Sequence, residues 1–478
     1  MDFIVYDIIL LILFAIFLSS FLYVGRKNLK REGLLLLYKT SWGIKLIENI
    51  GKKYKKTIKA LSYVSISLGY VLMASMIYFL YQIVKVYIFR PDVVSAVKVP
   101  PLIPLVPYLP QVFKLDFLPP FYFTYWIIII AVIAITHEFS HGIFASFSNI
   151  KIKKTGFGFF PFFLPIFLAA FVELDEERMA KKPKFIQLAV LSAGTFANVL
   201  TAIIFFVIFW AFFSLAFVPA GVVFDAYPYT TLDVSTVMSV NGIQLSDPSI
   251  EKIIELTKED ELNKIVADGK VFVSTKNSLE KQLAIDGNKI NLYYDSPAIN
   301  SRIIGAIIEI NGVKTNSMDK FKEEILKYSP GDKIKIKTDA GDEGGILEYE
   351  IVLGDNPEDP GKPWIGIAFF ERSGKGISGK ISELVSSFRE PHIYYKPKFG
   401  ELGLFIYHLL WWIILISISV ALVNMLPVGI FDGGKFFYLT IWGITKSEKK
   451  AKKAFAFMTY LFLLIVIVLM VFWAINFR

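Results

Sequence analysis

Cysteine is absent from this 478-residue chain, and histidine is scarce, with 4 copies. The chain can therefore form no disulfide, no cysteine-type zinc finger and no thiol nucleophile. Charged residues are also few, at 19%, whereas hydrophobic residues reach 54%. This balance excludes an ordinary soluble enzyme and predicts a membrane protein.

Six long apolar segments each offer the roughly 20 residues that a helix needs to cross a bilayer. They run over about residues 3–24, 61–88, 121–147, 185–217, 402–426 and 454–475. A basic loop follows the first segment, which we interpret as an anchor and not as a cleavable signal peptide. We expect a polytopic α-helical protein of the cell membrane with six transmembrane helices.

Lysines and arginines cluster in the loops after the first, third and fifth segments. Alternate loops of this kind face the cytoplasm. Both termini and the polar segment between the fourth and fifth spans are then extracytoplasmic. Membrane orientation explains the net charge of +9 better than nucleic-acid binding, so no nucleic-acid partner is expected.

The chain divides into four predicted parts. Residues 1–59 hold the first span and a basic cytoplasmic loop, and residues 60–217 hold spans two to four. Residues 218–397 form an extracytoplasmic α+β insert, and residues 398–478 hold spans five and six.

The insert contains an internal repeat. The segments beginning Ser239-Val-Asn-Gly-Ile and Glu309-Ile-Asn-Gly-Val each predict a strand, an Asn-Gly turn, a second strand and an amphipathic helix. This pattern resembles PDZ domains, best over residues 296–370 and more weakly over 221–256. We expect two tandem PDZ-like modules, with one module carrying a large insertion as the alternative. We expect these modules to bind a peptide end or to screen out substrates with bulky ectodomains; the alternative is a spacer with no ligand.

Residues 155–172 are apolar but contain Gly156, Gly158, Pro161 and Pro165, which disfavour a seventh spanning helix. Lysines on both sides would also break the loop-charge pattern. We predict a re-entrant extended hairpin, buried in protein or lining a cavity. It would either hold a substrate strand by edge pairing or act as a passive plug.

Two of the histidines fall in a five-residue window, His137-Glu-Phe-Ser-His141, inside the third apolar segment. Positions i and i+4 share one face of a helix, so both imidazoles can reach one Zn²⁺ ion. Glu138 beside them can take a proton from zinc-bound water. Ionisable groups at membrane depth are costly and mark functional sites, which indicates a hydrolytic zinc site within the bilayer.

A catalytic zinc needs a third protein ligand and one open position. We favour Asp432, because Pro427 interrupts the helix before it and Gly433 and Gly434 let the backbone turn tightly. The alternative is that Asp432 only caps a helix. His408, near the outer end of the fifth span, is a poorer candidate.

The H-E-F-S-H window and the segment N-x-x-P-x-x-x-x-D-G that begins at Asn424 together resemble the site-2 protease family of intramembrane zinc metalloproteases. The resemblance implies that His137, His141 and Asp432 bind Zn²⁺ and that Glu138 is the catalytic acid/base. It implies a metalloendopeptidase that hydrolyses peptide bonds within or near the transmembrane helices of single-span membrane proteins, as in regulated intramembrane proteolysis.

The fourth span carries Gly194 and Asn198, which match this family's pattern, whereas Thr195 replaces the usual proline. Asn198 is a candidate catalytic residue, because a buried amide can donate to the substrate carbonyl as negative charge develops. The alternative is a polar contact between helices.

Two other functions remain open from the residues. A membrane zinc peptidase that trims chain ends would take its third ligand from a glutamate, which Asp432 disfavours. A scaffold or ion carrier would rely on the PDZ-like part and would not need Glu138 between the histidines.

Overall fold

The architecture comes from a computed structural model that describes residues 3–26, 29–32, 35–90, 94, 100–101, 103, 105–115, 117–159, 168–283, 288–370, 379–380, 383 and 387–476. The chain forms two compact units, one of Met1–Ala211 with Phe405–Arg478 and one of Phe212–Leu404. The first unit is mainly helical and includes a small sheet. The second unit is α+β.

Six helices in the described part of the chain are long and apolar enough to cross a membrane, which confirms the predicted number. They are α1 (Phe3–Val24), α3 (Lys55–Phe89), α6 (Phe123–Phe147), α8 (Lys184–Ala216), α15 (Gly400–Asn424) and α17 (Glu448–Asn476). α3 and α17 begin before their predicted starts, because each helix includes a lysine-rich turn that hydropathy leaves out. The chain is therefore a multi-pass membrane protein, and its orientation stays a prediction.

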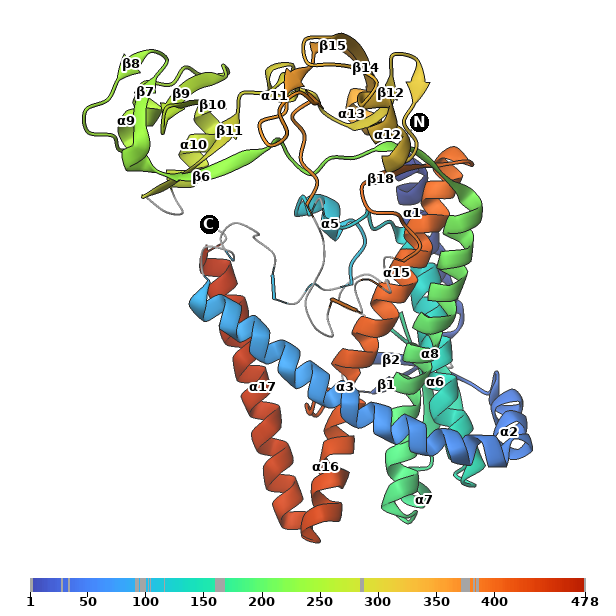
Figure 1. Ribbon diagram of the computed structural model, residues 1–478. Helices are drawn as coiled ribbons and strands as arrows, with labels where there is room; N and C mark the ends of the chain where they lie inside the picture. The colour runs from blue at the N-terminus through green and yellow to red at the C-terminus, as the bar shows by residue number, and fades with distance from the viewer. Residues whose placement is uncertain are drawn as a thin grey trace. The chain divides into compact units, whose positions relative to one another are not determined.

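The helix that carries H-E-F-S-H packs against two other spans. α6 contacts α8 through Phe144 and Phe196, whose ring centroids lie 6.5 Å apart. It contacts α15 through Tyr125 and Phe405, whose ring centroids lie 4.8 Å apart. The three helices run side by side in Figure 1. This aromatic packing holds α6 within the helical unit.

A carboxylate from α1 caps the start of α6. Asp7 is 1% exposed and accepts hydrogen bonds from the Tyr108 hydroxyl at 2.6 Å, the Phe123 N–H at 2.7 Å and the Thr124 N–H at 2.9 Å. The first N–H groups of a helix lack partners within the helix, and the helix dipole favours negative charge there. Asp7 therefore provides the acceptor for these buried donors. The apolar sequence of α1 does not indicate this role.

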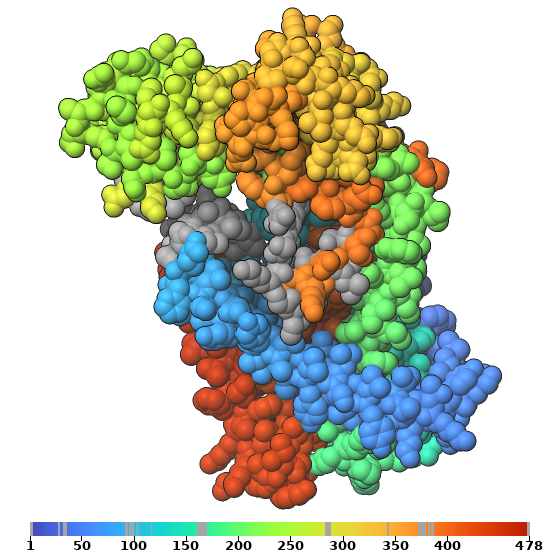
Figure 2. Space-filling model, in the orientation of Figure 1, coloured from blue at the N-terminus to red at the C-terminus, as the bar shows by residue number. Residues whose placement is uncertain are grey.

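α3 and α17 share one apolar cluster, and Figure 2 shows the light-blue α3 crossing in front of the red C-terminal helices. The rings of Tyr87 and Phe472 lie 6.0 Å apart at one end of this contact. Buried Met76 and Leu80 on α3 belong to the same apolar cluster as Phe462 on α17. These contacts tie α3 to the last span.

The described residues of this unit also form four shorter helices: α2 (Ile44–Lys53), α5 (Leu109–Val112), α7 (Glu176–Ala180) and α16 (Asp432–Thr445). α16 is a separate helix between the fifth and sixth spans, which the sequence analysis does not predict. It lies against α17, and the rings of Tyr438 and Phe455 are 6.2 Å apart. Asp432 is therefore the first residue of α16 and does not belong to the fifth span.

An antiparallel sheet of order β1-β2-β3-β4 lies beside α6. Its strands are β1 (Leu29–Glu32), β2 (Leu35–Thr40), β3 (Ile152–Phe159) and β4 (Leu168–Leu174). The pairing of Gly156 with Phe171 agrees with the extended hairpin predicted for residues 155–172. Residues 160–167 lie outside the described residues, and the membrane depth of the hairpin stays a prediction. β1 and β2 are not predicted.

The second unit contains two modules. The inner module, residues 229–294, has a six-stranded sheet of order β6-β11-β10-β9-β7-β8. Its strands are β6 (Tyr229–Asp233), β7 (Val237–Val240), β8 (Ile243–Gln244), β9 (Asn263–Ala267), β10 (Lys270–Ser274) and β11 (Lys289–Tyr294), with α9 (Ile250–Glu255) and α10 (Lys276–Leu283). Buried Val240, Ile253 and Leu292 contribute to its own apolar core.

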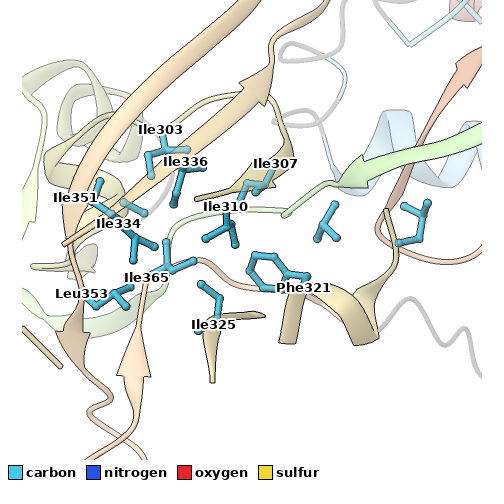
Figure 3. Packing of buried hydrophobic residues seen from close by; sticks show 13 residues of the cluster. Ile303, Ile307, Ile310, Phe321, Ile325, Ile334, Ile336, Ile351, Leu353 and Ile365 are labelled. Atoms are coloured by element: carbon cyan, nitrogen blue, oxygen red, sulfur yellow. The ribbon is translucent and has the colours of Figure 1, made fainter. Parts of the chain in front are cut away.

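The outer module comprises residues 217–228 and 296–397 and has a sheet of order β15-β14-β12-β5-β18, with β13 paired to β12. Its strands are β5 (Phe217–Val222), β12 (Ala306–Ile310), β13 (Val313–Lys314), β14 (Lys333–Asp339), β15 (Ile346–Val352) and β18 (Ile393–Pro397); β16 (Gly354–Asp355) and β17 (Pro363–Trp364) form a separate pair. Helices among its described residues include α11 (Pro297–Asn300), α12 (Met318–Ile325) and α13 (Gly341–Gly344). Isoleucines from the strands pack on Phe321 and Ile325 of α12 (Figure 3).

The two modules are nested in sequence. β5 precedes the inner module and β18 follows the rest of the outer module, yet the two strands pair, with Phe217 opposite Pro397. The insert therefore has two cores, one of them carried as an insertion in the other module. Its likeness to PDZ domains stays a prediction.

The repeated motif has the same structure in both modules. Asn241 and Asn311 both have positive φ, at 52° and 45°, as the Asn-Gly hairpin turn requires. Each side-chain oxygen accepts a hydrogen bond from the neighbouring strand, from Lys264 N at 3.1 Å and Lys335 N at 2.8 Å. The sequence repeat thus corresponds to one structural unit that occurs twice.

Candidate metal centre

His137 and His141 lie one turn apart on the same face of α6, as their spacing predicts. Their Nε2 atoms are 3.1 Å apart, and both side chains are nearly buried. Two imidazole nitrogens this close, with their lone pairs on one side, can hold a single cation between them.

Asp432 supplies the third group. Its Oδ2 atom lies 3.4 Å from Nε2 of His137 and 3.2 Å from Nε2 of His141. A tight turn between α15 and α16 brings it there: a Cβ on Gly433 would overlap the backbone of Met425 and Leu426. The two glycines after Asp432 thus let the turn close on itself.

The three side chains fit a zinc ion. Among the described residues, His137, His141 and Asp432 form a group whose ligand atoms all lie within 4.8 Å of one another. Zinc binds nitrogen and carboxylate oxygen at about 2.0–2.2 Å in a tetrahedral arrangement, so its ligand atoms should be roughly 3.3 Å apart. The measured separations of 3.1, 3.2 and 3.4 Å match that spacing.

Hydrogen bonds at the far side of each ring orient the imidazoles. Nδ1 of His141 lies 2.7 Å from the carbonyl oxygen of Val190 on α8. A carbonyl only accepts, so Nδ1 carries the proton and Nε2 has its lone pair free for a metal. Nδ1 of His137 lies 3.0 Å from the side-chain amide of Asn198, which is fully buried on α8.

α8 approaches the metal centre closely because of one glycine. A Cβ placed on Gly194 would lie 2.5 Å from Nε2 of His137 and 2.5 Å from Nε2 of His141. Any side chain at this position would displace the two imidazoles, so only glycine lets α8 form this wall of the site.

Glu138 follows His137 on α6 and faces the small sheet. Its Oε2 atom accepts a hydrogen bond from the backbone N–H of Val172 on β4, at 3.0 Å. β4 is the outermost strand of the sheet, and it pairs with β3 on its other side. The Glu138 carboxylate therefore lies between α6 and the outermost strand of the sheet that the structure describes, next to the two histidines in sequence.

Residues 125–467 match the family model described as Peptidase family M50, which covers more than two thirds of the chain. The chain belongs to peptidase family M50. A comparison with curated proteins finds no match for it. Membership in M50 makes the protein a metalloendopeptidase, and the family acts on membrane-protein substrates. The group of His137, His141 and Asp432 agrees with the zinc dependence of M50 peptidases.

His137, His141 and Asp432, which the sequence predicts as metal ligands, lie together in the structure, but the contacts that support them are not predicted. The roles of Val172 and Val190 are carried by backbone atoms, which leave no trace in the residue type. The one available signal is Ser192-Ala-Gly194-Thr, a run of small residues in an otherwise bulky helix, which marks a close approach of some neighbour.

Proposed function

We propose that this M50 peptidase hydrolyses peptide bonds within or near the transmembrane helices of single-span membrane proteins. The observation that carries the proposal is the convergence of His137, His141 and Asp432 beside the carboxylate of Glu138. A bound Zn²⁺ ion would polarise a carbonyl group and make a water molecule acidic enough to lose a proton near neutral pH.

In this proposal Glu138 is the general base and then the general acid. Its carboxylate takes a proton from the attacking water and returns it to the leaving nitrogen. Only Glu138 among the acidic residues lies between the two histidines on α6. The hydrogen bond from Val172 holds one oxygen in place and leaves the other for the proton.

The edge of β4 is the proposed binding place for the substrate. A peptide bond inside an intact helix is hidden by backbone hydrogen bonds, so the substrate must unwind before it is cut. An extended segment can add to an exposed sheet edge through main-chain hydrogen bonds. The Val172 N–H points from β4 toward Glu138, so a segment paired with this edge would pass beside the acid/base. The alternative, in which the hairpin only plugs the site, lacks a use for this edge.

The basic loops support an orientation with the metal centre toward the cytoplasm and residues 218–397 outside. In that orientation the two modules would meet the extracytoplasmic part of a substrate. Their repeated strand–turn–strand–helix unit supports a PDZ-like role in binding peptide ends.

The test compares purified wild-type protein with Glu138→Gln on a model single-span substrate in detergent, with and without a zinc chelator. Glu173→Gln is the matched control, because Glu173 is a neighbouring glutamate whose carboxylate pairs with Lys39 at 2.8 Å. General acid/base catalysis contributes about 10²–10⁴-fold, so Glu138→Gln should lose at least about 100-fold in cleavage rate. Its zinc content should equal that of wild type.

Cleavage by Glu138→Gln at the wild-type rate would support a metal carrier or scaffold instead of a protease. Cleavage that survives complete removal of zinc would also contradict the proposal. Loss of activity in Glu173→Gln to the same degree would show that the assay reports damage to β4 and not the chemistry of Glu138.

A further inference from the structure

The amide of Asn198 has an unusual environment for a fully buried group. Its Nδ2 lies 3.0 Å from Nδ1 of His137, whereas its Oδ1 has no hydrogen-bond partner among the described residues. A buried acceptor without a partner costs about 1–3 kcal/mol, so such an atom is rarely left unpaired without a reason.

The protonation of His137 conflicts with this arrangement once Nε2 binds a metal. A neutral imidazole carries one proton, so a ring that binds through Nε2 must keep its N–H at Nδ1. The Nδ1–H group then needs an acceptor, yet Nδ2 of Asn198 is itself a donor. His141 shows the compatible pattern, because its Nδ1 faces the carbonyl oxygen of Val190 at 2.7 Å.

A half-turn of the carboxamide removes the conflict. Oδ1 and Nδ2 nearly exchange places in such a turn, because the two ends of the group have almost the same shape. Oδ1 would then accept from Nδ1–H of His137, and the buried acceptor would no longer lack a partner. The rotation thus pairs Oδ1 of Asn198 with Nδ1–H of His137, and Nδ2 takes the place that Oδ1 leaves.

We infer that Asn198 is a positioning residue for the metal centre: its Oδ1 accepts the Nδ1–H of His137 and thereby keeps Nε2 of His137 free to bind zinc. The inference rests on the proposed zinc protease function. It gives Asn198 a role behind the ligand and not at the substrate carbonyl. Val190 and Asn198 on α8 then perform the same task for His141 and His137, and Gly194 between them leaves room for the rings.

The experiment measures zinc affinity by competition with a chelator, using the full-length protein in detergent. The variants are Asn198→Ala, which removes the acceptor, and Asn198→Asp, which keeps an acceptor of the same shape. Thr201→Val is the matched control: Thr201 is buried on α8 one turn further along and contacts Thr136, not a histidine. Groups that hold a ligating histidine typically contribute about 10–100-fold to metal affinity.

Asn198→Ala should therefore bind zinc about 10–100-fold more weakly, while Asn198→Asp and Thr201→Val should stay within about threefold of wild type. A second measurement uses the NMR spectrum of ¹⁵N-labelled histidine, which is simple to assign because the chain has only 4 histidines. The His137 signal of the zinc-loaded protein should show the proton on Nδ1 in wild type and Asn198→Asp.

Wild-type affinity in Asn198→Ala would overturn the inference, as would an equal loss in Asn198→Asp, because an aspartate cannot replace an amide donor. If Asn198→Ala does not fold, Asn198→Asp and the histidine spectrum still decide. Failure of the proposed function gives a different result: zinc affinity would be unchanged in Asp432→Ala, whatever the Asn198 variants do.

Discussion

The Glu138 carboxylate accepts a hydrogen bond from the backbone N–H of Val172, at 3.0 Å, and so joins the metal-binding helix to the outer strand of a sheet. Within the described residues β4 is one of the two edge strands of this sheet, and Glu138 is the proposed acid/base beside it.

Val172→Pro removes the N–H that Glu138 uses, while the side chain at this position stays apolar. A hydrogen bond to a charged group contributes about 1.5–3 kcal/mol, so cleavage of a model substrate should fall by roughly 10–100-fold. Val172→Ala is the control, because it keeps the N–H and should cleave at nearly the wild-type rate. Equal loss in the two variants would point to packing of the side chain instead.

Gly194→Ala places a methyl group where both imidazoles lie, 2.5 Å from each Nε2. We expect zinc affinity to fall by more than the ~10–100-fold typical of a neighbouring support residue, because the ligands themselves must move. Gly443→Ala on α16 is the matched control, since a Cβ there meets nothing within 4 Å. Zinc titration of the two variants distinguishes a local clash from a general effect of alanine, and unchanged affinity in Gly194→Ala would be inconsistent with this geometry.

Asp7→Ala leaves the Phe123 and Thr124 N–H groups without their buried acceptor. Each buried donor that loses its partner costs about 1–3 kcal/mol, so the Tm of the protein in detergent should fall clearly. Asp7→Asn retains one oxygen and should lie between wild type and Asp7→Ala. The hydroxyl of Tyr108, which donates to Asp7 at 2.6 Å, offers a milder test through Tyr108→Phe. A Tm unaffected by all three changes would show that the cap contributes nothing to stability.

The six spans and the histidine pair can be predicted from the sequence because each has a local signature; Asp432 is predicted from Pro427 and the two glycines together with the histidine pair. A span is a long apolar run, and the two histidines share a face at i and i+4. The Asn-Gly repeats are equally local, since the turn requires positive φ at both residues. The spans, the shared helix face and the turns depend on neighbouring residues in the chain and not on a distant partner.

The four-stranded sheet, the cap on α6 and the separate helix α16 depend on distant partners instead. Tyr38 in β2 pairs with Phe157 in β3, a contact that no window of sequence contains. The run Leu35-Leu-Leu-Tyr38 is the one sign of a strand, and it lies among basic residues that dominate the pattern. In the sequence, Asp7 is an isolated charge in an apolar helix. Its role is not visible there because its hydrogen-bond donors lie at the start of α6, more than 100 residues away.

The outer module allows a test that depends on pH. Burial raises the pKa of Asp339, but the hydrogen bond from Lys396, at 2.6 Å, and the N–H of Gly341 outweigh it and lower the pKa below its usual value. A lowered pKa means that the ionised group stabilises the fold above the pKa of unfolded aspartate, near ~3.9, and that this stability is lost as the pH falls below it.

Asp339→Asn should therefore lower the Tm of the full-length protein near pH 6, and the difference from wild type should shrink as the pH approaches about 3. Asp359→Asn is the control, because the Asp359–Lys362 pair is exposed and such pairs contribute about 0–1 kcal/mol. A Tm difference for Asp339→Asn that stays constant over this range would assign the effect to shape and not to charge.

The most direct measurement of the central claim is a crystal structure of the zinc-loaded protein with anomalous scattering at the zinc edge. The account predicts one anomalous peak at about 2.0–2.2 Å from Nε2 of His137, Nε2 of His141 and a carboxylate oxygen of Asp432. A peak elsewhere, or an Asp432 carboxylate too far from the ion to bind it, would contradict the account.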